Sequence, residues 1–287
     1  IYDVPLKMLD EGLDKVVLDR LKLNPKEKID LTQWNEFLKK YKNPKSKIKI
    51  GLVGKYVELQ DSYKSILESF IHAGAMNDLK VNVIPIHSEA INEETVGNIL
   101  SKVDGILVAP GFGERGIEGK ILSIKYSREK NLPFLGICLG MQMAVIEFSR
   151  NVLGLKDANS TEMNDLTKNP VITLMNDQLN IEDKGGTMRL GSWKCNIIKQ
   201  TLAYNIYKKE LISERHRHRY ELNFNYIEKL NKYGMVSSGV NPKTGLVEII
   251  EIPDHKWFVG VQFHPEYQST VQNPHPLFVS FVSACNK

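Results

Sequence analysis

The sequence predicts an α/β protein with a doubly wound, mostly parallel central sheet, flanking helices and an antiparallel extension. Three observations carry this prediction. From Ile48 onward, short apolar runs alternate with segments whose apolar residues recur at helical spacing. The run 105–109 is continuously apolar, as a central parallel strand is. Two later apolar runs, 248–252 and 257–263, are close enough in sequence to pair in antiparallel fashion.

Composition sets broad limits on what the protein is. The 287 residues include 42% hydrophobic residues, enough for a packed core, and the net charge is only +4. With 38 basic and 34 acidic residues, the whole chain gives no case for binding nucleic acid or an anionic membrane. The three cysteines lack the number and spacing of a disulfide framework, which fits a reducing, cytoplasmic location. No signal peptide or spanning helix is predicted, and the start at Ile1 indicates a piece of a longer polypeptide.

Residues 1–23 show the apolar spacing of one amphipathic helix. Residues 24–47 are rich in Lys, Asn and Pro around one short helical pattern at 31–41, and they are predicted to be a linker. The body of the protein is therefore expected to comprise residues 48–287.

The elements of the body follow in order. Strands are expected at 48–53, 81–86, 105–109, 132–137, 170–175, 188–198, 235–238, 248–252 and 257–263. Helices are expected after Asp61, which can act as the N-cap of an apolar stripe at 63–74, and also at 93–103, after Cys138 and at 276–284.

Cys138 is the first candidate for chemistry, because it lies where the apolar strand 132–137 changes to a helical pattern. Gly136 and Gly140 flank it and allow a sharp turn in which the cysteine backbone can be strained. A thiol at a helix N-terminus is also favoured as thiolate. A lone cysteine in an apolar run is more often only a small buried residue, so a second signal is needed.

The second signal is the sequence His264-Pro265-Glu266, which follows the apolar run 257–263. A thiol nucleophile requires a base, and the base requires an orienting group. His264 can be the base, and Glu266 lies on the same side if the segment is extended. The combination predicts a Cys-His-Glu triad.

The glycine-rich stretch 110–116 lies at the carboxyl end of a predicted strand, beside the cysteine turn. It lacks the lysine and hydroxyl ending of a phosphate-binding loop and the spacing of a dinucleotide fingerprint. Thiolate attack on a carboxamide creates an oxyanion that requires N–H donors, which gives this turn a better role.

These motifs together resemble the class I glutamine amidotransferases, through the stretch 136–142 and His264-Pro265-Glu266. Four further stretches, at 51–56, 158–162, 185–191 and 214–220, resemble the branch of that family that forms CTP, and the similarity runs from about Tyr2 to Phe278. The commoner family sequence has Gly where Pro110 stands. The proline loses its own N–H but leaves that of Gly111.

The resemblance implies roles for specific residues. The oxyanion donors would be the N–H groups of Gly111 and Leu139. The glutamine substrate would be held by Glu162 at its ammonium and Arg219 at its carboxylate, with Gln142 and Phe112 shaping the pocket. The lid linked to GTP activation would contain Arg115, Gly116 and Glu118. Without the resemblance, Glu162 is an ordinary surface acid and 215–219 an ordinary basic loop. A metal site at His216 and His218 is disfavoured, because companion ligands are missing.

The resemblance also implies the context of the reaction. Residues 1–23 would be the C-terminal end of a synthetase domain, 24–47 an interdomain linker and 48–287 the glutaminase domain. Glutamine would be the substrate, and this domain would need no cofactor. Ammonia would pass to a synthetase domain outside this chain, where ATP and Mg²⁺ support the amination of UTP to CTP, a ligase reaction of pyrimidine biosynthesis. GTP would activate the enzyme, and the full enzyme would form homotetramers.

Two alternatives remain open from the sequence. One is a glutaminase domain or subunit of another class I amidotransferase, such as those serving GMP or carbamoyl phosphate synthesis. The other is a non-catalytic assembly or regulatory module, against which the intact Cys138, His264 and Glu266 argue.

Overall fold

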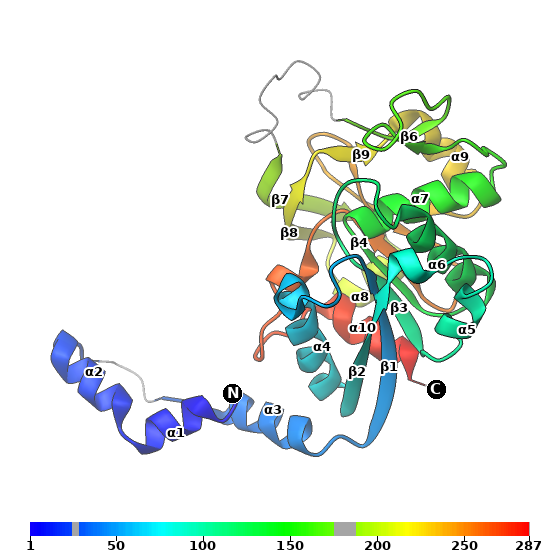
Figure 1. Cartoon of the computed structure of the whole chain (residues 1–287). Coiled ribbons are helices and arrows are strands. Elements are labelled where there is room, and N and C mark those ends of the chain that lie inside the picture. Colours follow the sequence, from blue (N-terminus) through cyan, green and yellow to red (C-terminus); the bar gives the residue numbers. More distant parts are fainter. Residues whose placement is uncertain (25–28, 175–187, 287) are drawn as a thin grey trace.

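A large mixed sheet forms the centre of the protein (Figure 1). The computed structural model describes residues 1–24, 29–174 and 188–286. Within them, nine strands pair in the order β2-β1-β3-β4-β12-β11-β10-β7-β8, and three short strands form a second sheet, β5-β6-β9. The strand bounds are β1 Ser46–Gly54, β2 Leu79–His87, β3 Gly105–Val108, β4 Phe134–Ile137, β5 Asn159–Ser160, β6 Pro170–Leu174, β7 Arg189–Ile197, β8 Leu211–His218, β9 Tyr220–Leu222, β10 Val236–Val240, β11 Val247–Glu251 and β12 Phe258–Val261.

The large sheet has a parallel half and an antiparallel half. β2, β1, β3, β4 and β12 pair in parallel, whereas β11, β10, β7 and β8 continue the sheet with antiparallel pairing. The predicted doubly wound sheet with an antiparallel extension is confirmed, including the antiparallel pair of β11 and β12.

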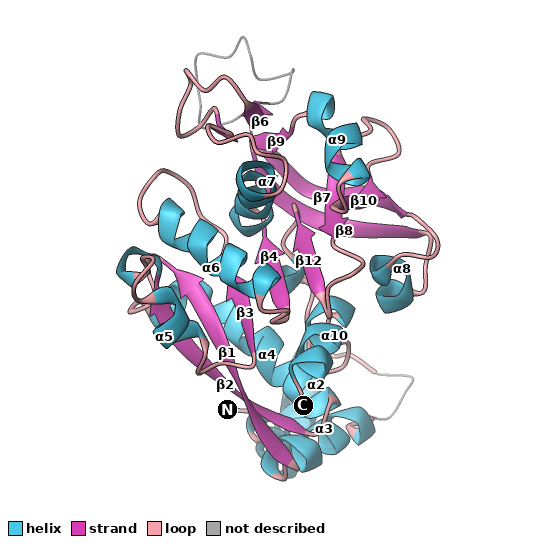
Figure 2. Cartoon of the chain, turned by 90° about the vertical axis from the view of Figure 1, so that its right-hand side faces the viewer, coloured by secondary structure: helices cyan, strands magenta, loops and turns pink. Residues whose placement is uncertain are grey.

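Helices cover both faces of the sheet (Figure 2). Apolar residues of α4 and α10 pack on one face, and those of α5, α6 and α7 pack on the other, because successive strand residues point to opposite faces. No helix among the described residues has the length and apolar character needed to cross a bilayer. The helices are α1 Val4–Asp10, α2 Leu13–Leu21, α3 Thr32–Lys42, α4 Lys64–Met76, α5 Val96–Leu100, α6 Ile117–Glu129, α7 Leu139–Asn151, α8 Leu202–Tyr207, α9 Ile227–Lys232 and α10 Pro276–Cys285.

The N-terminal segment differs from the sequence prediction. The one helix expected over residues 1–23 is two helices, α1 and α2, because Gly12 takes a left-handed conformation with φ of 71°. Neither helix contains a buried residue, and both extend away from the sheet (Figure 1). α3 is anchored to the body, since Phe37 and Leu38 are buried against α4.

Three further expectations required correction or extension. Asp61 is not an N-cap: it lies in a 3₁₀ turn, Gln60–Tyr63, and α4 begins at Lys64. The helix expected at 93–103 is shorter, spanning only α5. The stretch 215–219 is not a basic loop, since most of it belongs to β8. Of the expected features, residues 25–28 of the linker, Met175 and Gly185 to Thr187 lie outside the described residues.

The parallel half places three chain turns at one edge of the sheet. Val108 of β3 is paired with Gly136 of β4, and Ile137 of β4 is paired with Val261 of β12. The residues that follow these strands, 109–113, Cys138 and 262–264, therefore meet at the carboxyl edge, where open α/β sheets bind their ligands.

Candidate active site

Cys138 occupies a strained turn between β4 and α7. Its backbone has φ of 51° and ψ of −103°, a conformation that non-glycine residues rarely adopt. The flanking glycines permit it, because a Cβ at Gly136 would lie 2.7 Å from the carbonyl carbon of Gly140, and one at Gly140 would lie 2.3 Å from the Val108 oxygen. The backbone N–H of Cys138 donates to the Val261 carbonyl at 2.7 Å, which fixes the turn against β12. The predicted sharp strand-to-helix turn with a strained backbone at Cys138 is confirmed.

The three cysteines, all free, differ in their surroundings. Cys138 is the N-cap residue of the 13-residue helix α7, where the first N–H groups have no helical acceptors. Burial raises the pKa values of the Cys195 and Cys285 thiols. Of the three, only Cys138 therefore combines a helix N-terminus with a cavity wall.

His264 and Glu266 form a buried contact beside Cys138. Nδ1 of His264 lies 2.8 Å from Oε1 of Glu266, and since a carboxylate only accepts, Nδ1 carries the proton. The segment is not extended as predicted, because Pro265–Tyr267 form a 3₁₀ turn, yet this turn still brings the carboxylate to the ring. Tyr267 stacks on the imidazole, with centroids 5.1 Å apart.

The electrostatic setting of His264 favours the imidazolium. Burial alone would lower the pKa of His264, but Cys138 and Glu266 outweigh it and raise the pKa above its ordinary value. Nε2 of His264 is buried and has no hydrogen-bond partner among the described residues. A thiolate at Cys138 and a proton on His264 therefore stabilise one another.

The turn after β3 is held by two lysines. Nζ of Lys120, on α6, is fully buried and donates to the Ala109 carbonyl at 3.2 Å, and Nζ of Lys55 donates to the carbonyl of Phe112. Gly111 lies between these carbonyls, and a Cβ there would be 3.6 Å from Cδ2 of Leu139. The two residues expected to supply the oxyanion donors, Gly111 and Leu139, therefore lie close together in space.

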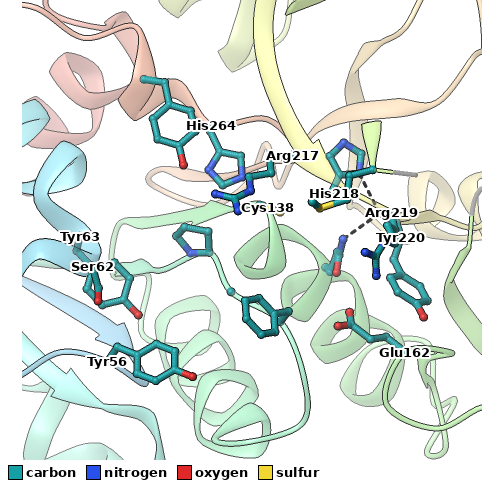
Figure 3. A pocket seen from close by; sticks show the side chains of 16 residues that line it. Tyr56, Ser62, Tyr63, Cys138, Glu162, Arg217, His218, Arg219, Tyr220 and His264 are labelled. Carbon is teal, nitrogen blue, oxygen red and sulfur yellow. Dashed lines mark hydrogen bonds between the residues drawn. The ribbon is translucent and has the colours of Figure 1, made fainter. Parts of the chain in front are cut away.

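These side chains surround one cavity of about 520 Å³. Cys138 and His264 lie along one side of it, and Glu162, Arg219 and Tyr220 lie together at one end (Figure 3). The expected site residues that line the cavity are Gly111, Phe112, Cys138, Gln142, Glu162, Arg219 and His264.

The far end of the cavity carries opposite charges. Glu162 and Arg219 both act on Tyr220: burial first and then Glu162 raise the pKa of the phenol, whereas Arg219 lowers it. Oε1 of Glu162 accepts a hydrogen bond from the Gly113 N–H at 3.1 Å, which ties this acid to the turn after β3. A ligand with an ammonium and a carboxylate group would find both counter-charges here.

The class I glutamine amidotransferase family model matches residues 58–284, most of the chain. The chain belongs to this family. As a member, it is similar to the CTP synthase of Flavobacterium psychrophilum, with 67% identity over 287 residues, 100% of this chain and 53% of that protein. It is also 64% identical to the CTP synthase of Christiangramia forsetii over 100% of this chain and 53% of that protein. The chain thus spans about half the length of these relatives.

Solved structures share this fold. The glutaminase domain of Trypanosoma brucei CTPS with bound acivicin superposes with a TM-score of 0.78 and 38% identity, covering 83% of this chain and 93% of that one. A putative GMP synthase component from Thermoplasma acidophilum shares the fold, with a TM-score of 0.52 and 17% identity over 83% and 94% of the two chains. This amidotransferase fold includes both the parallel and the antiparallel strands described above.

The expected lid residues of this amidotransferase domain lie outside the cavity wall. The Arg115 guanidinium lies 5.1 Å from the Tyr56 ring centroid and 3.7 Å from Glu89. Gly116, with φ of 73°, is the N-cap residue of α6, and Glu118 pairs with Arg150 at 3.0 Å.

Several residues at the site were missed from the sequence. Lys120 and Gln262 are fully buried beside the reacting groups, and the Tyr220 carbonyl accepts from Gln142. Gln262 had one signal: it is a polar residue within the apolar run 257–263, two residues before His264. The described residues contain no group of three His, Cys, Asp or Glu side chains suited to a metal ion.

Proposed function

We propose that this chain is the glutaminase part of a CTP-forming enzyme and that it hydrolyses glutamine through a γ-glutamyl thioester. One observation carries the proposal: Cys138 in its strained turn lines the same cavity as His264, and Nδ1 of His264 is hydrogen-bonded to Oε1 of Glu266. A nucleophile, a base and an orienting acid in this arrangement are suited to acyl transfer from an amide.

The geometry supports a two-step reaction. The Cys138 thiolate attacks the side-chain carboxamide, and the oxyanion accepts hydrogen bonds from the Gly111 and Leu139 N–H groups. The His264 imidazolium gives its proton to the leaving nitrogen, so that ammonia departs and the thioester remains. Neutral His264 then takes a proton from water, which attacks the thioester, and the thiolate leaves as glutamate forms.

Recognition of free glutamine is assigned to the far end of the cavity. Glu162 would accept hydrogen bonds from the α-ammonium, and Arg219 would hold the α-carboxylate. The Gln142 side chain and the Phe112 loop would shape the pocket around the side chain of the substrate. The opposite charges around Tyr220 support this assignment.

The wider context is proposed from the relatives named CTP synthase. Residues 1–23 would end a synthetase domain, 24–47 would link it, and 48–287 would form the glutaminase domain. The remaining half of the longer enzyme would bind UTP, ATP and Mg²⁺ and receive the ammonia. GTP would act through the lid at Arg115, Gly116 and Glu118, and the enzyme would be a cytoplasmic homotetramer.

The test measures glutamine hydrolysis and acceptor use together. The full-length enzyme should form CTP from UTP and ATP with either glutamine or ammonia, and should release one glutamate for each glutamine-dependent CTP. Use of a different acceptor would assign the chain to another amidotransferase. Absence of any glutamate release, with the ammonia reaction intact, would favour a non-catalytic module.

A further inference from the structure

Gln262 connects the nucleophile with the substrate end of the cavity. Its side chain is fully buried, and its Nε2 lies 3.7 Å from Sγ of Cys138. Its Oε1 lies 3.3 Å from Nε2 of Gln142, which also lies 3.0 Å from the Tyr220 carbonyl. We propose that Gln262 is a further catalytic residue, which donates a hydrogen bond to the Cys138 sulfur and is held in that orientation by Gln142 and the Tyr220 carbonyl.

The orientation of both amides follows from a single fixed acceptor. A backbone carbonyl can only accept, so the Gln142 atom facing Tyr220 must be its NH₂ group. That group has a second N–H, which requires an acceptor on Gln262, and this acceptor is Oε1. The remaining end of Gln262 is its NH₂ group, which faces the sulfur. A flip of either amide would place two acceptors or two donors against each other.

The backbone around Gln262 fixes the position of its side chain. The N–H of Gln262 donates to the Glu248 carbonyl of β11 at 2.9 Å, and the preceding residue, Val261, accepts from the Cys138 N–H at 2.7 Å. The Gln262 amide follows β12 and the Cys138 sulfur follows β4, and these two strands are paired neighbours in the sheet. Since Gln262 has no exposed surface, the amide cannot turn toward solvent for an alternative partner.

A donor in this position acts on the charged sulfur. Hydrogen bonds to an ionised group are stronger than those to a neutral one, so the Gln262 amide stabilises thiolate more than thiol. The charged groups and the histidines on the other elements around the sulfur and its cavity are His264 after β12, Lys120 on α6, Arg217 and His218 on β8, Arg219 and Glu162. Four tyrosines, Tyr56, Tyr63, Tyr220 and Tyr267, also line this cavity. Gln262 adds a neutral donor to this set, whose contribution does not itself titrate.

This inference rests on the proposed function for its catalytic meaning, but its test does not. The rate of Cys138 alkylation by iodoacetamide is measured against pH, with mass spectrometry separating Cys138 from Cys195 and Cys285. Gln262→Met keeps the side-chain length and removes the amide. We expect the midpoint of the alkylation profile to move upward by about one to two pH units. Glutamine hydrolysis at pH 7 should fall roughly ten- to a hundredfold.

Two further variants complete the experiment. Gln272→Met is the matched control, because Gln272 is an exposed glutamine in the following loop and should leave the profile unchanged. Gln142→Met removes the hydrogen bond that orients Gln262 but keeps the Gln262 amide, so it should shift the midpoint in the same direction by a smaller amount. Because Gln142 also lines the cavity, this variant is judged by the alkylation profile and not by glutamine hydrolysis. It also provides a test if Gln262→Met does not fold. Folding is checked by thermal melting.

The outcomes separate this inference from the proposed function. A folded Gln262→Met protein, or Gln142→Met if the former does not fold, with the wild-type alkylation midpoint would overturn the role of Gln262. If the midpoint shifts in Gln262→Met but the wild-type protein also hydrolyses no glutamine, the result would support the hydrogen bond and count against the proposed function.

Discussion

The imidazole of His264 and the carboxylate of Glu266 lie 2.8 Å apart, although only Pro265 separates them and the chain turns between them. The backbone N–H of His264 is itself fixed by the Arg215 carbonyl on β8 at 2.8 Å. The contact leaves Nε2 as the ring atom available to the thiol and the substrate. The variants below test the reaction that this arrangement supports.

Cys138→Ala should abolish glutamine hydrolysis and leave the fold intact, because the thiol carries the covalent step. In the full-length enzyme, ammonia should still be used. A glutamine analogue with an electrophilic side chain should label Cys138 and spare Cys195 and Cys285, whose burial raises their thiol pKa values. Equal labelling of all three in a folded protein, measured by mass spectrometry, would contradict a uniquely reactive Cys138.

Glu266→Gln should lower kcat by roughly 10²- to 10⁴-fold with little change in KM, because it removes the charge that stabilises the imidazolium. Steady-state kinetics of glutamate release would measure both constants. Glu228→Gln changes an exposed glutamate in the first turn of α9 that does not line the cavity, so it is the control and should behave as wild type. An increase in KM alone would move Glu266 from the catalytic group to the binding pocket.

Arg219→Ala should reduce kcat/KM for glutamine by roughly thirty- to a thousandfold, equivalent to about 2–4 kcal/mol, because it leaves the substrate carboxylate without its forked partner. Arg219→Lys should also be impaired, since an ammonium lacks the planar pair of donors. Alkylation of Cys138 by iodoacetamide should persist in both variants. Arg217→Ala provides the comparison, because Arg217 also lines the cavity. A larger loss in that variant than in Arg219→Ala would reassign the carboxylate contact.

Lys120→Met should change how stability depends on pH. Burial, together with Lys55, lowers the pKa of Lys120 from 10.5 to about 7, whereas the unfolded chain keeps the ordinary value. Between these values the unfolded state binds more protons, so this group makes wild-type stability rise with pH. The destabilisation that comes from burying the charged Lys120 amine is complete below pH 7 and absent above about 10.5, and its full size is on the order of 5 kcal/mol.

Urea unfolding of wild type and Lys120→Met at pH 6.5, 8 and 9.5 would measure this difference. The stability of the variant relative to wild type should be greatest at pH 6.5 and decrease as the pH rises. A difference independent of pH would show that Lys120 titrates normally in the folded protein. Loss of the hydrogen bond to Ala109 should also lower the rate of glutamine hydrolysis, since that bond holds the turn that contains Gly111.

The sequence by itself predicted the parallel half of the sheet and the strained turn at Cys138. Strand and helix periods differ, so the alternation from Ile48 predicted the parallel half, and a cysteine between two glycines predicted the strained turn at Cys138. Where the pattern was ambiguous, prediction failed. The basic stretch 215–219 was expected to be a loop, but most of it belongs to strand β8. Its buried face carries polar residues such as His216 and His218, so the alternation of buried and exposed positions is not visible as an alternation of apolar and polar residues.

Only the tertiary structure decided which distant residues meet. Gln262 is 124 positions from Cys138 and 120 from Gln142, and nothing local in the chain specifies that their side chains touch. Lys120 is equally hidden in the sequence, because an isolated lysine on a helix is ordinarily exposed. Such contacts depend on strand order and register, which bring the ends of β3, β4 and β12 to one edge of the sheet. The physical reason is that periodicity records only which face of an element is buried, whereas register sets what that face contacts.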